Sequence, residues 1–206
     1  MSGTERFTAL TGPAAPLMRA NIDTDTIIRI ERLTGTTPEQ TAPYLFEALR
    51  FDPAGRERDD FVLNRPAFRH APILLAGDNF GCGSSREGAV WALKFSGMRS
   101  VIAPSFGDIF ANNCFQNFVL PVALPAAQVE RLATQCAEGA AITVDLVNQM
   151  VIAPNGEKMP FAVEAIRRES LLEGLDDIGL TQKHEAAIAA FQMRDRQARP
   201  WVWQPG

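Results

Sequence analysis

The residues best placed to do chemistry lie in one glycine-rich segment, GDNFGCGSSREGA, which runs from Gly77 to Ala89. Ser84 and Ser85 follow two closely spaced glycines, and Arg86 comes next. Glycines let a backbone turn sharply and approach a ligand, and the free N–H groups of a following helix attract anions. A guanidinium in the first helical turn opposes the helix dipole, so its presence indicates a function. The segment predicts an anion-binding turn that carries a serine hydroxyl.

The same segment also has a purely structural interpretation. Ser84 and Glu87 fit a capping box, S-x-x-E, which needs no function, and the residues alone leave both interpretations open. A P-loop and a G-x-G-x-x-G fingerprint lack their lysine and third glycine, and a nucleophile elbow fits neither serine. With only His70 and His184 in the chain, a Ser-His-Asp triad has little support. Cys82 fits a packing residue of the turn better than a reactive thiol.

Composition and charge narrow the class of protein. The chain has 206 residues, of which 46% are hydrophobic and 21% charged, so it suits a buried core in one large or two small domains. The net charge of −4 and the scattered lysines and arginines indicate no basic face for nucleic acid. Because no run of about 18 apolar residues occurs, we expect no membrane-spanning helix.

The cysteines and the N-terminus bear on compartment and metal. Cys82, Cys114 and Cys136 are odd in number, widely spaced and without a CxxC pair. That pattern argues against a disulfide framework and against a zinc or iron–sulfur site built by this chain alone. The N-terminus, MSGTERFTAL, lacks the apolar core of a signal peptide. We therefore expect no metal on this chain and a cytoplasmic location.

Alternating buried strands and helices predict an α/β fold. The clearest unit is a strand at 72–76, a turn at 77–83 and a helix from Ser84 or Ser85 to about 96. We expect further strands at 7–10, 100–103, 118–122, 141–147 and 149–153, a turn at Asn155-Gly156, and helices at 106–116, 161–173 and from an N-cap at Thr181 to about 196.

Three local expectations concern the connections. Residues 12–16 are expected to turn the chain. Asp23 and Asp25 should share one side of an extended segment, because strand side chains alternate. Residues 33–60, rich in Thr, Pro, Gly and charge, predict a long connection with one short helix around 43–51. Long loops of this kind are often functional or mobile.

Several motifs together resemble the small subunits of isopropylmalate isomerases and the swivelling domain of aconitase. The resemblance runs in order from about residue 5 to 192, and five stretches carry it. They are NIDTDTII (21–28), FVLN (61–64), NFGCGSSRE (79–87), APSFGDIFANNCFQNFVLPV (103–122) and GLDDIGLTQKHEAAIAAF (174–191).

This resemblance implies a fold, a reaction and a partner. It implies a single layered β/β/α swivelling domain over residues 1–206, with a tail at about 193–206 that is either flexible or docks on a partner. The reaction would be that of a hydro-lyase of leucine biosynthesis, which interconverts 2-isopropylmalate and 3-isopropylmalate by dehydration and rehydration. A [4Fe-4S] cluster would belong to a large subunit, and the active site would form where the two subunits meet.

The resemblance also implies roles for individual residues. Ser84 takes the position of the catalytic base, acting as an alkoxide, and Arg86 that of the group that holds a substrate carboxylate and supports the alkoxide. Helix N–H groups and a guanidinium are able to stabilise such an anion in a dry site. The implied substrate-binding positions are Ser85, Arg86, Asp23, Thr24, Arg29, Arg32 and Thr34. The last three lie on a stretch similar to the family's substrate-selecting loop.

Two departures from the family pattern bear on the substrate. Residues 29–33 read RIERL where the family has Pro-Lys and an aromatic residue before Leu, and Gly88 stands where the family usually has His. A paralogue acting on another 2-alkylmalate, such as methylmalate or dimethylmalate, is therefore an alternative. A non-catalytic binding module is a second alternative. Thr34 follows Leu33 where relatives that accept tricarboxylates often carry Arg, which favours substrates without a third carboxylate.

Overall fold

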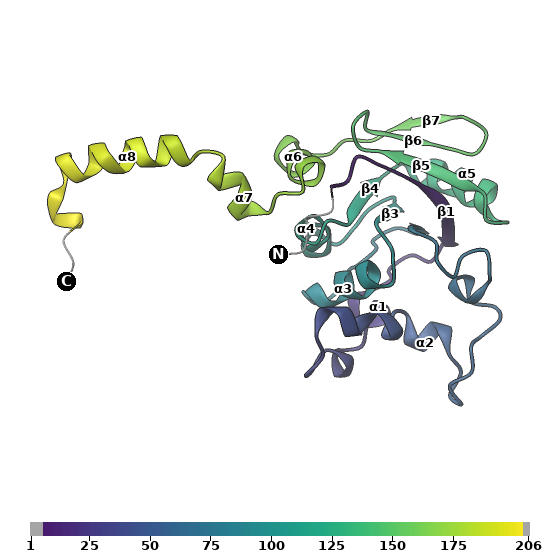
Figure 1. Ribbon diagram of the computed structural model, residues 1–206. Coiled ribbons are helices and arrows are strands. Elements are labelled where there is room, and N and C mark those ends of the chain that lie inside the picture. Colours follow the sequence, from purple (N-terminus) through teal and green to yellow (C-terminus); the bar gives the residue numbers. More distant parts are fainter. Residues whose placement is uncertain (1–5, 204–206) are drawn as a thin grey trace.

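One seven-stranded sheet organises the computed structural model, which describes residues 6–203 (Figure 1). The strand order is β4-β3-β2-β1-β5-β6-β7. The strands are β1 (Ala9–Leu17), β2 (Ile73–Ala76), β3 (Ser100–Ala103), β4 (Leu120–Ala123), β5 (Ala141–Asp145), β6 (Met150–Ile152) and β7 (Lys158–Pro160). Strands β1 to β4 are parallel, whereas β1, β5, β6 and β7 pair antiparallel.

The helices cover both faces of the sheet, and short 3-10 turns fill the connections (Figure 1). The helices are α1 (Thr24–Ile27), α2 (Glu47–Arg50), α3 (Glu87–Phe95), α4 (Asp108–Gln116), α5 (Ala126–Cys136), α6 (Ala165–Glu173), α7 (Asp177–Gln182) and α8 (Glu185–Ala198). The 3-10 turns are η1 (Ile30–Arg32), η2 (Pro38–Tyr44), η3 (Val62–Asn64) and η4 (Pro200–Val202).

Two hydrophobic clusters form the core, one on each face of the sheet. Neighbouring residues of β2 alternate between them: Leu74 belongs to the first cluster and Leu75 to the second, as the pleat of a strand requires. Helices α3 and α4 contribute to the first cluster, and α5 and α6 to the second. All residues of β2 and β3 are buried, which is typical of parallel strands covered on both faces.

Helices α7 and α8 with η4 form an arm, residues 177–203, that extends away from the sheet (Figure 1). Neither helix of the arm has a buried residue. The arm nevertheless carries large apolar side chains: Ile178 is 67% exposed, Met193 66% and Trp201 68%. Its tip folds on itself, because the Trp203 indole donates a hydrogen bond of 2.9 Å to Asp195.

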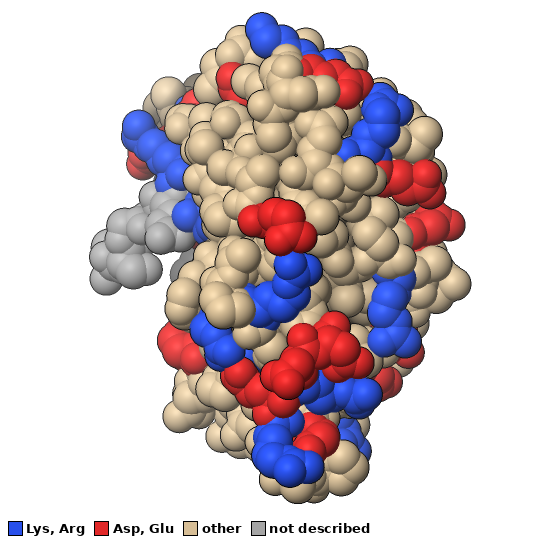
Figure 2. Space-filling model, turned by 90° about the vertical axis from the view of Figure 1, so that its right-hand side faces the viewer, with Lys and Arg blue, Asp and Glu red and all other residues tan. Residues whose placement is uncertain are grey.

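Charged side chains of both signs intermingle on the face of the sheet domain opposite the arm (Figure 2). Ion pairs among the described residues include Arg56 with Asp52 and Arg69 with Glu57. Among residues 6–203, no helix combines the length and apolar character needed to cross a membrane.

The structure confirms the α/β alternation and the strands expected near 72–76, 100–103, 118–122, 141–147 and 149–153. The turn expected at 12–16 is wrong, because β1 continues through it. Pro13 is the last residue of β1 paired with β5, and Ala14 is the first paired with β2. The strand changes partner there, so a proline without an N–H group is tolerated.

Other local expectations were also wrong. Residues 24–27 form a helix rather than an extended segment, because Asp23 accepts a hydrogen bond of 2.7 Å from the N–H of Thr26 and caps it. Thr181 does not cap the last helix: it lies inside α7, and α8 begins after its N-cap His184. Helix α5 and strand β7 were not anticipated.

Candidate active site

The glycine-rich turn is clamped onto the first core cluster. A Cβ on Gly77 would lie 2.6 Å from backbone atoms of Arg19 and Ala20. Gly81 has φ +72°, and a Cβ there would enter the ring of Phe110. Phe80, fully buried, packs edge-on against the same ring at 5.4 Å between centroids. The turn therefore has little freedom at its base.

The DTD segment, residues 23–25, lies directly against this turn, although some 60 residues separate the two in the sequence. The N–H of Thr24 donates to the carbonyl of Cys82 at 3.0 Å, and the N–H of Gly81 donates to Ile22 at 2.7 Å. The buried hydroxyl of Thr24 donates to the carbonyl of Ser84 at 2.9 Å. The structure thus brings together two of the segments from which site residues were predicted.

Arg86 and Asp25 form an ion pair at the centre of this junction. The Arg86 side chain is 14% exposed and the Asp25 side chain 55%. The atom of Arg86 that contacts Asp25 is Nη1, which is buried. The Nε and Nη2 atoms make no hydrogen bond within residues 6–203, so the guanidinium keeps donors for another anion.

Asp23 is a second carboxylate beside Arg86. Hydrogen bonding by Thr26 lowers the pKa of Asp23, and the charge of Arg86 lowers it further. Asp23 is therefore ionised at neutral pH, and its carboxylate is occupied in capping α1.

Ser84 and Ser85 are exposed at the rim of the turn. Within residues 6–203, neither hydroxyl makes a hydrogen bond to another protein group. Helix α3 begins at Glu87 with Arg86 as N-cap, and no side chain caps it. The capping-box interpretation of Ser84, one of the two left open by the sequence, is therefore wrong, and so is the placement of Arg86 in the first helical turn. The two hydroxyls remain available beside uncapped helix N–H groups.

The predicted site residues in the loop 29–34 make different contacts from those of the DTD segment. The Arg32 guanidinium donates to Glu47 at 2.8 Å and lies 4.7 Å from the centre of the Tyr44 ring. Arg29 is exposed and 3.7 Å from Glu31, and Thr34 is exposed. No hydrogen bond or ion pair among the described residues joins Arg29, Arg32 or Thr34 to the turn. Arg32 anchors the loop to α2 instead.

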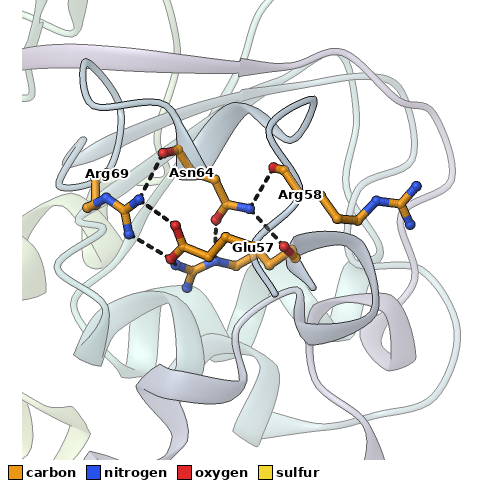
Figure 3. A network of polar contacts seen from close by, with 5 residues as sticks. Glu57, Arg58, Asn64 and Arg69 are labelled. Atoms are coloured by element: carbon orange, nitrogen blue, oxygen red, sulfur yellow. Dashed lines mark hydrogen bonds and ion pairs between the residues drawn. The ribbon is translucent and has the colours of Figure 1, made fainter. Parts of the chain in front are cut away.

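The sequence motif FVLN holds the long connection in place (Figure 3). The Asn64 amide donates to the carbonyls of Arg50 and Arg58 at 2.8 and 2.9 Å, and the Nε atom of Arg50 donates to its oxygen at 3.1 Å. Arg69 joins this network through Glu57 and the Asn64 carbonyl. Sequence reasoning had given Asn64 no role, because its partners are backbone carbonyls that a motif does not display.

The three cysteines do not converge on one another. Cys114 lies in the first core cluster and Cys136 in the second, on the other side of the sheet, while Cys82 lies in the turn. Burial raises the pKa of the Cys136 thiol to about 11 and that of Cys114 well above its ordinary value. Within residues 6–203 no group of three or more His, Cys, Asp or Glu side chains is arranged to hold a metal. An iron–sulfur cluster does not fit this chain alone.

Family models cover most of the chain. The model for the aconitase C-terminal domain matches residues 4–127, and one described as LeuD_N matches 130–165. A third, for the C-terminal domain of the 3-isopropylmalate dehydratase small subunit, matches 177–202. The small subunit from Rhodospirillum centenum is 54% identical over 96% of this chain and 98% of its own length. The chain belongs to the 3-isopropylmalate dehydratase small-subunit family.

Other members of this small-subunit family agree. The small subunit from Dinoroseobacter shibae is 51% identical over 96% of this chain and all of its own length. The crystal structure of 3-isopropylmalate dehydratase from Methanocaldococcus jannaschii superposes with a TM-score of 0.65 at 26% identity, and covers 88% of this chain and 98% of the archaeal chain. The fold is therefore the mixed α/β fold of the aconitase C-terminal domain.

Proposed function

We propose that this chain is the small subunit of a two-subunit hydro-lyase that interconverts 2-isopropylmalate and 3-isopropylmalate in leucine biosynthesis in the cytoplasm. One observation carries the proposal: a family member presents Arg86 beside two serine hydroxyls at a helix N-terminus, and within residues 6–203 neither the hydroxyls nor Nε and Nη2 of Arg86 make a hydrogen bond. A guanidinium grips a carboxylate with two hydrogen bonds, which suits a dicarboxylic substrate.

Ser84 acts as the base in this proposal. As an alkoxide it takes a proton from one substrate carbon while hydroxide leaves the neighbouring carbon, and an alkene forms. Water then adds in the opposite sense, so that the hydroxyl and the proton exchange places. The N–H groups at the start of α3 and the positive charge of Arg86 support the alkoxide, provided that water is excluded.

The remaining site residues position these two. Asp25 holds the guanidinium of Arg86, and Asp23 and Thr24 fix the segment that carries Asp25 against the turn. Ser85 is available to donate to a substrate carboxylate. Arg29 and Thr34, both exposed, are proposed to contact the substrate from the loop, and Arg32 contributes only if it leaves Glu47.

The site is open to solvent in this chain, and a partner is needed to close it. We place a [4Fe-4S] cluster on that partner, a large subunit, because the cysteines of this chain lie on opposite faces of the sheet. The arm 177–203, which includes most of the tail from 193, is proposed to dock on the same large subunit. Its exposed apolar residues and its match to the family's C-terminal model support this assignment. The chain otherwise forms a single swivelling domain.

One assay tests the proposal and separates it from its alternatives. The chain is co-purified anaerobically with its large subunit, and kcat/KM is measured for isopropylmalate, methylmalate, dimethylmalate, citrate and homocitrate. Preference for isopropylmalate supports the proposal, and preference for a smaller alkylmalate supports the paralogue. No turnover of any of these acids by an assembled, cluster-loaded complex supports the non-catalytic module. Iron and sulfide analysis of the isolated chain should find no cluster, and a stoichiometric one would contradict the assignment to the partner.

A further inference from the structure

Leu33 fills a notch that Gly88 leaves in the first turn of α3. Gly88 is buried, and a Cβ built on it would lie 2.5 Å from Cδ2 and 2.8 Å from Cδ1 of Leu33. The backbone of Gly88 is not in the left-handed region, in contrast to Gly81 and Gly83. Gly88 therefore provides space for another side chain rather than an unusual backbone conformation.

The contact between Leu33 and Gly88 joins the loop of residues 29–36 to the helix that begins at the candidate site. Gly88 follows Arg86 by two residues, and Leu33 ends η1, where its N–H donates to Ile30 at 3.0 Å. Asp25 in the same segment pairs with Arg86. The segment 21–33 thus meets the start of α3 at two points, one charged and one apolar.

The second anchor of the loop, Arg32, contacts α2 rather than α3. Arg32 ties the loop to α2 through Glu47 and stacks on Tyr44. Leu33 packs against the first core cluster as well as against Gly88. The Leu33–Gly88 contact is therefore an apolar link between the loop and the helix that begins at the site, in addition to the packing of η2 against α3.

We propose that this contact sets the position of the loop beside Arg86 and thereby determines which alkyl substituent the enzyme accepts. The proposal rests on the proposed function. Closely packed contacts tolerate little added volume, so a methyl group on residue 88 displaces Leu33 and with it the loop. A pocket wall that moves by the size of one methylene changes discrimination about 10-fold or more.

The test uses Gly88→Ala, Leu33→Val and the double variant, with Ile30→Val as matched control. Ile30 is the neighbouring loop residue and is 50% exposed, so its trimming should change little. Limited tryptic cleavage within residues 29–32 is measured on the chain without its partner, relative to cleavage after Arg196 in the arm. The ratio of kcat/KM for isopropylmalate to that for methylmalate is measured with the large subunit.

Gly88→Ala should raise cleavage and shift the substrate ratio, each about tenfold. Adding Leu33→Val should bring both back toward the unsubstituted values, because the two sites are in contact. Unchanged cleavage in Gly88→Ala, or purely additive effects in the double variant, would overturn the proposal. So would faster cleavage with an unchanged substrate ratio. If no alkylmalate is turned over, the proposed function fails, whereas the cleavage results still decide whether the contact positions the loop.

Discussion

The glycine-rich turn and the C-terminal arm differ in how far their side chains are buried within this chain. The turn is held by close contacts at Gly77 and Gly81, while its two serines are exposed and the Arg86 side chain is 14% exposed. The arm has no buried residue in either helix, although it carries Ile178, Phe191 and Trp201. Rigidity of the turn comes from this chain, whereas burial of the arm has to come from outside it.

The difference has an energetic reason. A catalytic constellation needs its geometry fixed before substrate arrives, and core packing provides that at the turn. An arm whose apolar side chains are unburied gains nothing for the isolated fold. Covering these side chains with another surface would be favourable, which supports the proposal that the arm docks on a partner.

The largest expected effect is that of Ser84→Ala on turnover. Loss of a proton-transfer group typically lowers kcat by ~10²–10⁴-fold. Unfolding should be nearly unchanged, because the hydroxyl makes no hydrogen bond within the described residues. Urea denaturation of the isolated chain and kcat of the assembled enzyme give the two readouts. A variant that unfolds early but turns over normally would mean that Ser84 is structural.

A matched pair of phenylalanines tests the contrast in burial. Phe80→Ala should cost ~3–5 kcal/mol of unfolding free energy, because the ring is fully buried and packs on Phe110. Phe191→Ala should change the unfolding free energy by less than ~0.5 kcal/mol, because that ring is 55% exposed. Both are measured by urea unfolding of the isolated chain. Equal costs would show that the arm folds back onto the sheet domain in solution.

Truncation after Asp176 tests whether the arm contributes to binding of the large subunit rather than to folding of this chain. The deletion removes the ion pairs of Lys183 with Glu169 and Glu173, which are exposed and contribute little. We expect the unfolding free energy to stay within ~1 kcal/mol, while affinity for the large subunit falls at least about 30-fold, as loss of apolar anchors does. Lys183→Ala is the control for the ion pairs. Full affinity of the truncated chain would place the docking surface elsewhere.

Much of the body of the fold was predictable from local pattern. The apolar runs of β2 and β3 and the glycines between β2 and α3 indicate a strand–turn–helix unit without any long-range information. What the pattern missed depends on partners distant in sequence. Pro13 looks like a turn residue until one knows that β1 changes partner at that point.

The sequence predicted which candidate residues lie together but not the contacts that they make. The resemblance named Ser84, Arg86 and the DTD segment, and the structure brings these together. It did not indicate that Arg32 is held by Glu47, since that pairing depends on how the long connection folds. The arm shows a different limit. The sequence predicts a helix to about residue 196, but it does not indicate whether the apolar side chains of that helix are buried within this chain.

The smallest expected effect concerns the loop anchor and its pH dependence. The hydrogen bonds from Arg32 lower the pKa of Glu47 below its ordinary value. At pH values above the ordinary pKa of a glutamate, Glu47 is ionised in both the folded and the unfolded chain, so the stabilisation by Arg32 is fully present. As the pH falls, the unfolded chain takes up the proton first, and the stabilisation is lost as the pH passes through the lowered folded pKa.

Glu47→Gln should therefore unfold at lower urea than the unsubstituted chain at pH 7, by a small margin, because the pair is partly exposed to water. The margin should shrink as the pH is lowered below the ordinary pKa of a glutamate. Glu31→Gln is the matched control: Glu31 lies in the same loop and is 3.7 Å from Arg29, with both side chains more than half exposed. Glu31→Gln should unfold at almost the same urea concentration as the unsubstituted chain at either pH. A difference for Glu47→Gln that persists unchanged in acid would mean that the shape of the Glu47 side chain, and not its charge, holds Arg32 in place.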